Sequence, residues 1–244
     1  MISCIILTKN NQASINITLE SVLWANELIV IDDYSTDQTL NIVKKYSAHI
    51  YQRHLNNDWS AQRNFGLKKA KNPWVLFIDS DEVIKKDLKN EIITAIKSNI
   101  YSGYYLKRTD ILFGKTLNHG ETANVNLLRL AKKNKAKWTR SVHEVMKVKG
   151  QTKNLKRPIR HYRHLTIAEF LSNINTYTSI DQSSLKKEGK RLKQFDFLKP
   201  IAKFTQNYII RLGFLDGFQG LIIAYLMSLH SLIVRIKQWE QKRA

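Results

Sequence analysis

The sequence predicts an α/β fold with a central, mostly parallel sheet flanked by helices, and three observations support that prediction. Strand-length apolar runs recur through residues 1–100, helix-like segments separate them, and the main runs end in polar clusters. Apolar strands that alternate with helices are typical of parallel sheets covered on both faces. Hydrophobic residues make up 43% of the 244, which is enough for a buried core.

The predicted elements of the first half alternate between strand and helix. We expect strands at residues 2–7, 28–31, 48–51 and 74–78. We expect helices at residues 14–24, from 36 or 37 to 46, at 59–70 and at 85–99, with Asp58 as a plausible N-cap of the third. Ligands bind at the carboxyl ends of the strands in such sheets, so the polar clusters after these strands should gather along one edge.

The second half is less regular and ends in helices. We expect an extended stretch at 101–113, a loop at 114–124, strands at 125–130 and near 145–148, and helices at 166–185, 195–212 and 217–239. A capping box of Thr166 and Glu169 would begin the first of these helices. The chain therefore divides into a domain at 1–165 and a C-terminal helical, basic and amphipathic extension at 166–244.

Charge is distributed unevenly along the chain. Residues 1–100 hold 12 basic and 11 acidic residues, a net charge of +1, whereas residues 101–244 hold 28 and 9, a net charge of +19. The positive field of the second part indicates an anionic partner, which can be a phospholipid, a phosphorylated glycolipid or a nucleic acid. The single cysteine, Cys4, lies in an apolar run and is expected to be a small core residue. With no signal peptide before the first strand, we expect a cytoplasmic protein.

The stretch at 217–234 has no formally charged residue and about the minimum length that spans a bilayer. Its polar residues favour an amphipathic helix in the membrane interface, and an ordinary core helix is the alternative. The basic residues near it that would meet anionic headgroups are Lys199, Lys203, Arg211, Arg235, Lys237, Lys242 and Arg243.

The acidic run after the strand at 74–78 is the first candidate site. Asp79 and Asp81 alternate along the chain, so their carboxylates project to the same side. Paired carboxylates suit Mg²⁺ or Mn²⁺, which would neutralise the diphosphate of a nucleotide-sugar. The alternative is an acidic turn that caps the next helix; the position at the end of an apolar strand favours the metal site.

Three further positions carry candidate chemistry. Either Asp32 or Asp33 can accept a hydrogen bond from the N3–H of a uracil, and we expect the other to cap a turn. Arg63 can approach a phosphate if its helix crosses the sheet edge, or it can be a surface arginine. Glu144 is a candidate general base for a sugar transfer.

These segments, in this order, resemble glycosyltransferase family 2, which has the GT-A fold. The matching motifs are Thr8-Lys9-Asn10, Asp32-Asp33-Tyr34-Ser35-Thr36-Asp37, Gln62-Arg63-Asn64 and Asp79-Ser80-Asp81-Glu82, each in the place where the family has it. Later segments are similar to the branch that adds glucose to the inner-core heptose of lipopolysaccharide or lipooligosaccharide. They are Leu127-Leu128-Arg129-Leu130, Val142-His143-Glu144 and Gly213-Phe214-Leu215-Asp216-Gly217.

The resemblance implies a role for each candidate residue. Residues 1–100 would bind the nucleotide-sugar and residues 101–165 the acceptor. The donor nucleotide would be bound by Thr8, Asp32, Asp33, Arg63 and Asp79. Asp79 and Asp81 would bind a divalent metal, Mg²⁺ or Mn²⁺, and Glu144 would be the base. Accessory or acceptor roles are assigned to Glu82, His143 and His161. Tyr34 and Gln38 depart from the family pattern, in which small residues or glycine are common at these places.

The resulting hypothesis is an inverting, metal-dependent hexosyltransferase that moves glucose from UDP-glucose to a phosphorylated glycolipid. It would be peripheral on the cytoplasmic face of the inner membrane, against an anionic membrane surface. One alternative acceptor is a polyprenyl phosphate. Another class of function is a basic nucleic-acid-binding protein; the acidic strand ends would repel phosphate, so no nucleic-acid partner is expected.

Overall fold

The structure, a computed structural model, describes residues 1–123, 125–141, 143–163, 170–171, 174–175, 178–179, 181–182 and 192–243. The chain forms two compact units. One contains Met1–Asp110 and Val125–Tyr162, and the other contains Ile111–Asn124 and Arg163–Ala244. The domain boundary expected after residue 165 stays a prediction. The second unit takes in Ile111–Asn124 as well as the chain from Arg163 onward, so it is made of two separate stretches of sequence.

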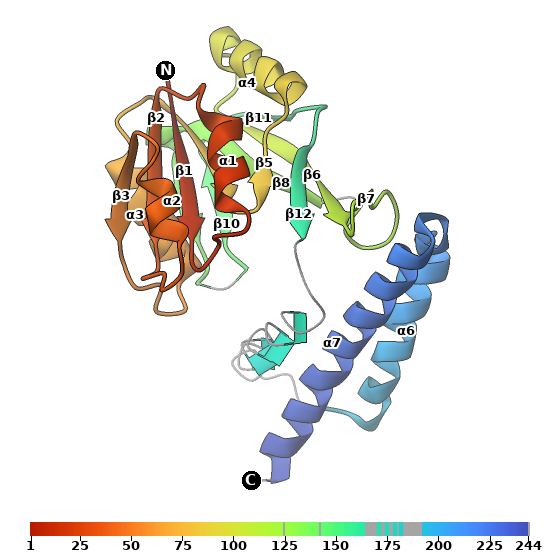
Figure 1. Cartoon of the computed structure of the whole chain (residues 1–244). Coiled ribbons are helices and arrows are strands. Elements are labelled where there is room, and N and C mark those ends of the chain that lie inside the picture. The colour runs from red at the N-terminus through yellow and green to blue at the C-terminus, as the bar shows by residue number, and fades with distance from the viewer. Residues whose placement is uncertain are drawn as a thin grey trace. The chain divides into compact units, whose positions relative to one another are not determined.

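A mixed sheet of ten strands organises the chain (Figure 1). Its parallel part contains β1 (Ile2–Thr8), β2 (Glu27–Asp32), β3 (Ala48–Gln52) and β4 (Trp74–Asp79), in the order β3-β2-β1-β4. The sheet continues through β8 (Val125–Lys132), β6 (Gly103–Leu112), β12 (Ile159–Arg163) and β5 (Glu82–Val83). Strand β8 is antiparallel to both β4 and β6, and β12 is antiparallel to β5. The strands predicted for the first half are confirmed, and antiparallel strands extend them into the second half.

Three short pairings complete the strands. Strands β7 (Lys115–Thr116) and β11 (Thr152–Asn154) pair with β6. Strands β9 (Ala136–Thr139) and β10 (Val145–Val148) form a separate antiparallel ribbon. Two residues of the site described below belong to this ribbon or border it: Trp138 lies in β9, and Glu144 directly precedes β10.

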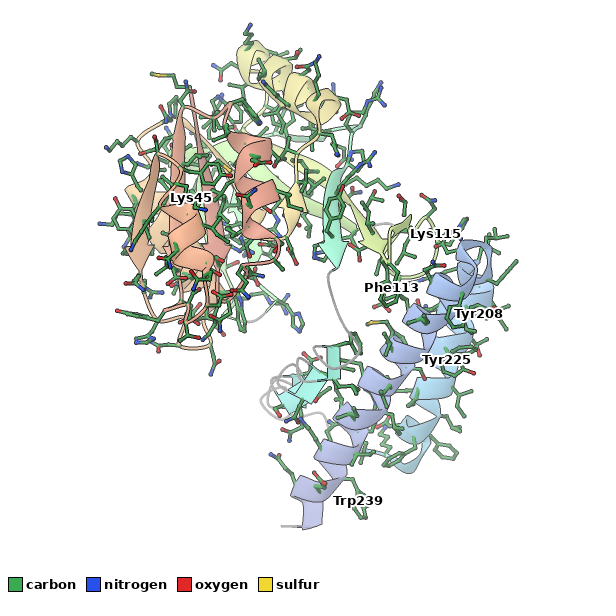
Figure 2. All side chains as sticks on the ribbon, in the orientation of Figure 1. Lys45, Phe113, Lys115, Tyr208, Tyr225 and Trp239 are labelled. Atoms are coloured by element: carbon green, nitrogen blue, oxygen red, sulfur yellow. The ribbon has the colours of Figure 1, made fainter. Side chains whose placement is uncertain are left out.

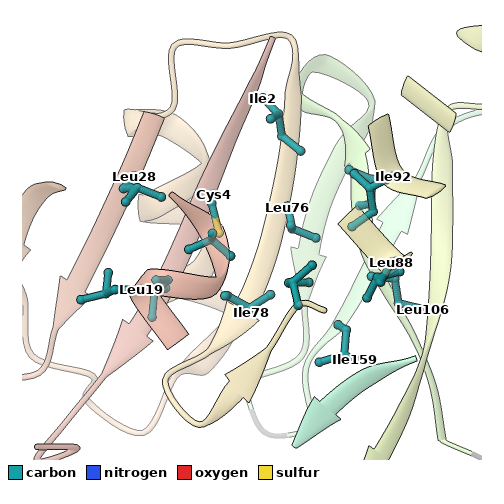
Figure 3. Close-up of a cluster of buried hydrophobic side chains, with 14 of the residues drawn as sticks. Ile2, Cys4, Leu19, Leu28, Leu76, Ile78, Leu88, Ile92, Leu106 and Ile159 are labelled. Carbon is teal, nitrogen blue, oxygen red and sulfur yellow. The ribbon is translucent and has the colours of Figure 1, made fainter. Parts of the chain in front are cut away.

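Alternating side chains of the parallel strands fill two cores, one on each face of the sheet. On one face, Cys4 and Ile6 of β1 pack in a cluster with Leu19 of α1 (Ile15–Val22) and Leu88 of α4 (Lys86–Ser98), as Figure 3 shows in part. On the other face, Ile5 packs in a cluster with Leu67 of α3 (Trp59–Lys69). Burial raises the pKa of the Cys4 thiol, as expected for a core cysteine.

The predicted helices of the first half are present, and each is shorter than predicted. The helix α2 (Thr39–Val43) is the shortest, because the preceding residues form the polar turn that follows β2. Asp58 is the N-cap of α3 as predicted, and its carboxylate accepts a hydrogen bond of 2.8 Å from the N–H of Ala61. The helix expected at 166–185 lies largely outside the described residues.

Two antiparallel helices, α6 (Lys199–Thr205) and α7 (Phe218–Arg243), lie side by side in the second unit (Figure 1). A π-helical turn (Gln206–Ile210) and a 3-10 turn (Gly213–Asp216) connect them. A third short turn, Gln194–Leu198, precedes α6. The Phe204 and Tyr225 rings are 4.7 Å apart between centroids, and Tyr208, Tyr225 and Trp239 are drawn in Figure 2.

One helix in the described part of the chain is long and apolar enough to cross a membrane. It covers Phe218–Gln241 and has a mean hydropathy of 1.5. Only 22% of its most apolar window is buried, whereas a core helix of a soluble protein is mostly buried.

The fold makes a prediction at Gly66, where α3 crosses β1. A Cβ atom at Gly66 would lie 2.6 Å from Cγ2 of Ile5, which is fully buried in the centre of the sheet. Gly66→Ala should therefore lower the free energy of unfolding by about 1–2 kcal/mol. This is the cost of overpacking less the stabilisation that the higher helix propensity of alanine provides. Denaturant unfolding would measure it. The control Lys68→Ala, exposed on the same helix, should stay within about 0.5 kcal/mol. A Gly66→Ala protein as stable as the wild type would contradict the packing.

Candidate active site

The pairing register brings the sequence-predicted polar residues together at the carboxyl ends of the parallel strands. Thr8 of β1 is opposite Asp32 of β2, and Leu7 is opposite Asp79 of β4. The clusters that the sequence placed along one edge therefore meet on neighbouring strands. The turn after β4 is fixed from α1 and the β1 loop: Thr18 donates a hydrogen bond to the Ser80 carbonyl, and the Ser80 hydroxyl donates one to Asn11.

Asp79 is held between two buried guanidinium groups. Arg63 Nη2 lies 2.8 Å from Oδ1 of Asp79, and Arg129 Nη2 lies 2.7 Å from Oδ2. The arginine side chains are 4% and 6% exposed, and the Asp79 side chain is 30% exposed. Burial alone would raise the pKa of Asp79, but the positive charges of Arg129 and Arg63 outweigh it and lower that pKa well below its usual range.

Trp138 provides the surface on which both arginines lie. The Arg63 guanidinium carbon is 4.7 Å from the ring centroid, and that of Arg129 is 5.9 Å from it. The backbone of Trp138 is bonded to α3, because its N–H and carbonyl pair with the side-chain amide of Asn64, both at 2.9 Å. Thus Arg63 and Asn64, adjacent in the sequence, respectively bind Asp79 and fix the β9 strand.

Glu144 joins the same group of charges. Arg63 Nε donates a hydrogen bond of 2.9 Å to Oε1 of Glu144, whose side chain is 18% exposed. Arg63 therefore bridges Glu144 and Asp79, which are far apart in the sequence. The residue before Glu144, His143, has a positive φ of 51° and is exposed, a backbone conformation that is strained for a non-glycine residue and is found at functional sites. The roles predicted for Glu144 and His143 stay predictions.

Glu82 is fully buried and contacts Asp79 through the Asp79 backbone. Its Oε2 accepts a hydrogen bond of 2.9 Å from the Asp79 N–H, and its Oε1 is 3.9 Å from Arg129 Nη2. Burial and the charge of Asp79 raise the pKa of Glu82, which favours its protonated form. A fully buried carboxyl group can act on Asp79 and Arg129 but has no surface for a ligand.

His161 connects Asp81 to a buried carboxylate. Its Nε2 is 3.1 Å from Asp81 Oδ2, and its Nδ1 is 2.9 Å from Oδ1 of Asp110, which is fully buried. Burial lowers the pKa of His161, but its hydrogen bonds to Asp110 and Asp81 outweigh this and raise the pKa to about 9. The pairing of β12 with β5, in which His161 is opposite Glu82, brings the ring beside the acidic turn.

At the nucleotide end, the two adjacent aspartates have different partners. Asp32 is fully buried and accepts hydrogen bonds from the Ser35 N–H, the Ser35 hydroxyl and the Gln52 amide, so it closes the turn as expected of one of the pair. Asp33 accepts hydrogen bonds from Lys9 Nζ at 2.7 Å and from the Leu55 N–H at 3.1 Å. Burial alone would raise the pKa of Asp33, but its hydrogen bonds, first of all the one from Lys9, outweigh burial and lower that pKa.

Thr8 and Tyr34 flank this pair. Thr8 is buried, and its carbonyl accepts a hydrogen bond of 3.0 Å from the Asp33 N–H. Tyr34 is 45% exposed and stacks on His54, with ring centroids 4.1 Å apart. The donor-binding roles of Thr8, Asp32 and Asp33 stay predictions.

Sequence reasoning gave no role to Arg129 or Asp110. Arg129 stands in the apolar run of β8, and Asp110 stands next to the apolar end of β6. A charged residue within an apolar strand was the available signal, because such a residue is buried only when it is paired. Its partner, however, could be read only from the strand order.

The comparisons with known proteins agree with this geometry. The family model described as Glycosyl transferase family 2 matches residues 3–161. The chain therefore belongs to glycosyltransferase family 2 and is a glycosyltransferase.

Relatives of similar length carry glycosyltransferase names. The lipopolysaccharide core biosynthesis glycosyltransferase LpsC of Rhizobium meliloti (strain 1021) is 26% identical over 245 residues, covering 93% of this chain and 90% of LpsC. An uncharacterized glycosyltransferase of Rickettsia prowazekii (strain Madrid E), RP128, is 28% identical over 93% of this chain and 82% of its own length. The crystal structure of S. aureus TarS 1-349 has a TM-score of 0.51 at 18% identity, covering 98% of this chain and 88% of TarS 1-349, and shows the same GT-A fold.

Arg129 gives a prediction about the charge balance of the site. Arg129→Met would leave Asp79 with one guanidinium group. It would also remove the positive charge of Arg129, which lies beside both Asp79 and Glu82. We expect the free energy of unfolding at pH 7 to fall by about 3–5 kcal/mol, as is usual when one partner of a buried ion pair is removed. Denaturant unfolding is the measurement, and Arg140→Met, at the exposed position directly after β9, is the control.

The pH dependence of this difference has a defined sign. The depressed pKa of Asp79 stabilises the fold above its ordinary value of 3.8, and that stabilisation is lost as the pH falls. The gap between wild type and Arg129→Met should therefore narrow in acid. A gap that is absent at pH 7, or that widens in acid, would contradict the role of Arg129.

Proposed function

We propose that the chain is an inverting transferase that moves glucose from UDP-glucose onto a membrane-held, phosphorylated glycolipid, a heptose of the lipopolysaccharide or lipooligosaccharide inner core. The observation that carries the proposal is Arg63, which holds Asp79 at the strand end and Glu144 in one hydrogen-bonded group. A donor-binding carboxylate and a candidate base are thereby fixed relative to each other. The similarity to LpsC, named for lipopolysaccharide core biosynthesis, supports the class of acceptor.

Glu144 acts as the general base in this proposal. It takes the proton of the acceptor hydroxyl as that oxygen attacks the anomeric carbon of the sugar, and UDP leaves from the opposite face. The Arg63 hydrogen bond occupies Oε1 of Glu144, which fixes the carboxylate and leaves its other oxygen to take the proton. Asp33 and Thr8, at the ends of β2 and β1, bind the nucleotide.

Asp81 would hold the divalent metal, and His161 would orient its carboxylate. Both oxygens of Asp79 are bonded to arginines, whereas Asp81 is 33% exposed and faces the His161 ring. Asp110 holds that ring through Nδ1, so Nε2 is directed toward Asp81 and orients its carboxylate. One protein carboxylate with phosphate oxygens and water suits Mg²⁺ or Mn²⁺, so Asp81 fits the metal, although no group of three or more possible ligands occurs among the described residues. A bound metal would neutralise the leaving diphosphate.

The second unit would hold the enzyme at the cytoplasmic face of the inner membrane. Large apolar side chains are exposed on and beside α6 and α7, including Phe195, Ile201, Ile210 and Phe218. Basic side chains accompany them, which suits an interface with anionic lipid. The long apolar helix α7 supports the same proposal.

The experiment on the donor end compares wild type with Asp81→Asn. We expect wild type to hydrolyse UDP-glucose slowly without acceptor, faster with Mn²⁺, and Asp81→Asn to lose about 100-fold of the Mn²⁺-dependent rate, since several kcal/mol of charge stabilisation would be removed. Release of UDP is the measurement, across a panel of UDP-sugars. The control is Asp87→Asn, whose side chain is 52% exposed on α4. Equal Mn²⁺-dependent rates for wild type and Asp81→Asn would exclude the metal role of Asp81.

A second experiment separates a hydroxyl acceptor from a polyprenyl phosphate. Glu144→Gln keeps a side-chain oxygen for Arg63 but removes the base, so glucosyl transfer to a heptose hydroxyl should fall about 10²- to 10⁴-fold. A phosphate acceptor needs no deprotonation of a hydroxyl, and transfer to it would remain largely intact. Incorporation of labelled glucose into each acceptor is the measurement, with Glu20→Gln, at an exposed position on α1, as the control. Full activity of Glu144→Gln on the glycolipid would refute the base.

A further inference from the structure

The turn between α6 and α7 is hydrogen-bonded to the loop that joins β6 to β8. Asp216, in the Gly213–Asp216 turn, is buried, and its carboxylate accepts hydrogen bonds from the N–H groups of Asn118 and His119, at 3.0 and 2.8 Å to Oδ2. Lys115 Nζ donates a bond of 2.7 Å to the Asp216 carbonyl, and the Gly120 N–H donates one of 2.9 Å to the Arg211 carbonyl. The loop conformation is therefore set by the sequence Gly213-Phe214-Leu215-Asp216-Gly217, a motif that the proposed reaction leaves without a role.

The same carboxylate also orients a histidine ring. His119 Nδ1 is 2.9 Å from Asp216 Oδ1; the Asp216 side chain is 3% exposed and the His119 side chain is 31% exposed. Nδ1 faces the buried carboxylate, so the Nε2 edge is the part of the ring that a ligand can reach. No partner of Nε2 occurs within the described residues.

The ring bond adds more than attachment of the loop. Two backbone N–H groups already bind Asp216 and anchor the loop, so the imidazole bond adds orientation to a side chain that is partly in solvent. A histidine fixed at Nδ1 by a carboxylate has a set ring orientation. A ring protonated on both nitrogens donates from Nε2 as well as Nδ1, so Nε2 can donate a hydrogen bond to an anionic oxygen.

We propose that His119 binds a phosphate group of the acceptor and that Asp216 is the positioning residue that aims it. The proposal rests on the proposed function, which makes the acceptor a phosphorylated glycolipid. A phosphate monoester could also come from a lipid headgroup, so the test separates the two sources.

The test is direct binding of a lipid-free, phosphorylated, heptose-containing oligosaccharide, measured by calorimetry without donor. His119→Ala should raise its Kd by about 10- to 100-fold, the range for a lost charge-assisted hydrogen bond. The same oligosaccharide after phosphatase treatment should bind wild type and His119→Ala equally. UDP-glucose hydrolysis by His119→Ala should equal that of wild type, and His49→Ala, whose side chain is 53% exposed on β3, is the matched control.

Asp216→Asn tests positioning against a merely structural role. We expect the same selective loss for the phosphorylated ligand, and no further loss when Asp216→Asn is added to His119→Ala. If Asp216→Asn does not fold, the exposed His119 variant decides the proposal alone. Unchanged binding by His119→Ala, or an equal loss for both oligosaccharides, would overturn it.

The lipid arm uses vesicles that contain an anionic phospholipid. A His119→Ala defect confined to vesicle sedimentation, with oligosaccharide binding intact, would assign the ring to headgroups and overturn the acceptor proposal. Because binding is measured without donor, it also stands apart from the proposed function: a wild type that binds the oligosaccharide through His119 but transfers no glucose would refute the function alone.

Discussion

Asp79 lies between two guanidinium groups that are almost fully buried, and much of the first unit is arranged to make that possible. An arginine buried without a carboxylate would be strongly unfavourable, and so would a carboxylate beside Glu82 without the arginines. Arg63 comes from α3 and Arg129 from β8, so the ion pairs join a helix, a parallel strand and an antiparallel strand. The position of each of these elements is thereby tied to one carboxylate. Trp138 completes the arrangement by covering both guanidinium planes.

The period of two along a strand explains how the same sheet supplies both a core and a site. In β1, Cys4 and Ile6 face one core and Ile5 faces the other, so each residue inside the sheet is committed to packing. Only at the strand end do polar side chains become free of the two cores, and there Thr8 is opposite Asp32. The chemistry is confined to the edge because the interior has no place for it.

The sequence alone predicted the strand ends that form this edge, but it did not predict all the residues that complete the site. Apolar runs identified the parallel strands, and the polar clusters that follow them identified Asp79 and Asp81, because both signals are local. Glu144 was named as a candidate base from its residue type, and the resemblance supported that choice, since nothing in its own neighbourhood distinguishes it from an exposed glutamate. Arg129 and Asp110 were missed for a different reason. Their partners lie on strands that are neighbours only through the order β4-β8-β6-β12, and antiparallel pairing over such sequence distances leaves no local pattern.

The charge balance of the site bears on the proposed metal. Burial and the charge of Asp79 favour the protonated form of Glu82, and the raised pKa of His161, about 9, keeps its ring cationic at neutral pH. Besides Glu82, the site brings together four acidic and four basic side chains. The acidic side chains are Asp79, Asp81, Asp110 and Glu144, and the basic ones are Arg63, Arg108, Arg129 and His161. The arginines are consumed in neutralising carboxylates, so little positive charge remains for an anionic diphosphate. A nucleotide-sugar would therefore need an added cation, and Asp81, the most exposed of the carboxylates, is the group best able to share one.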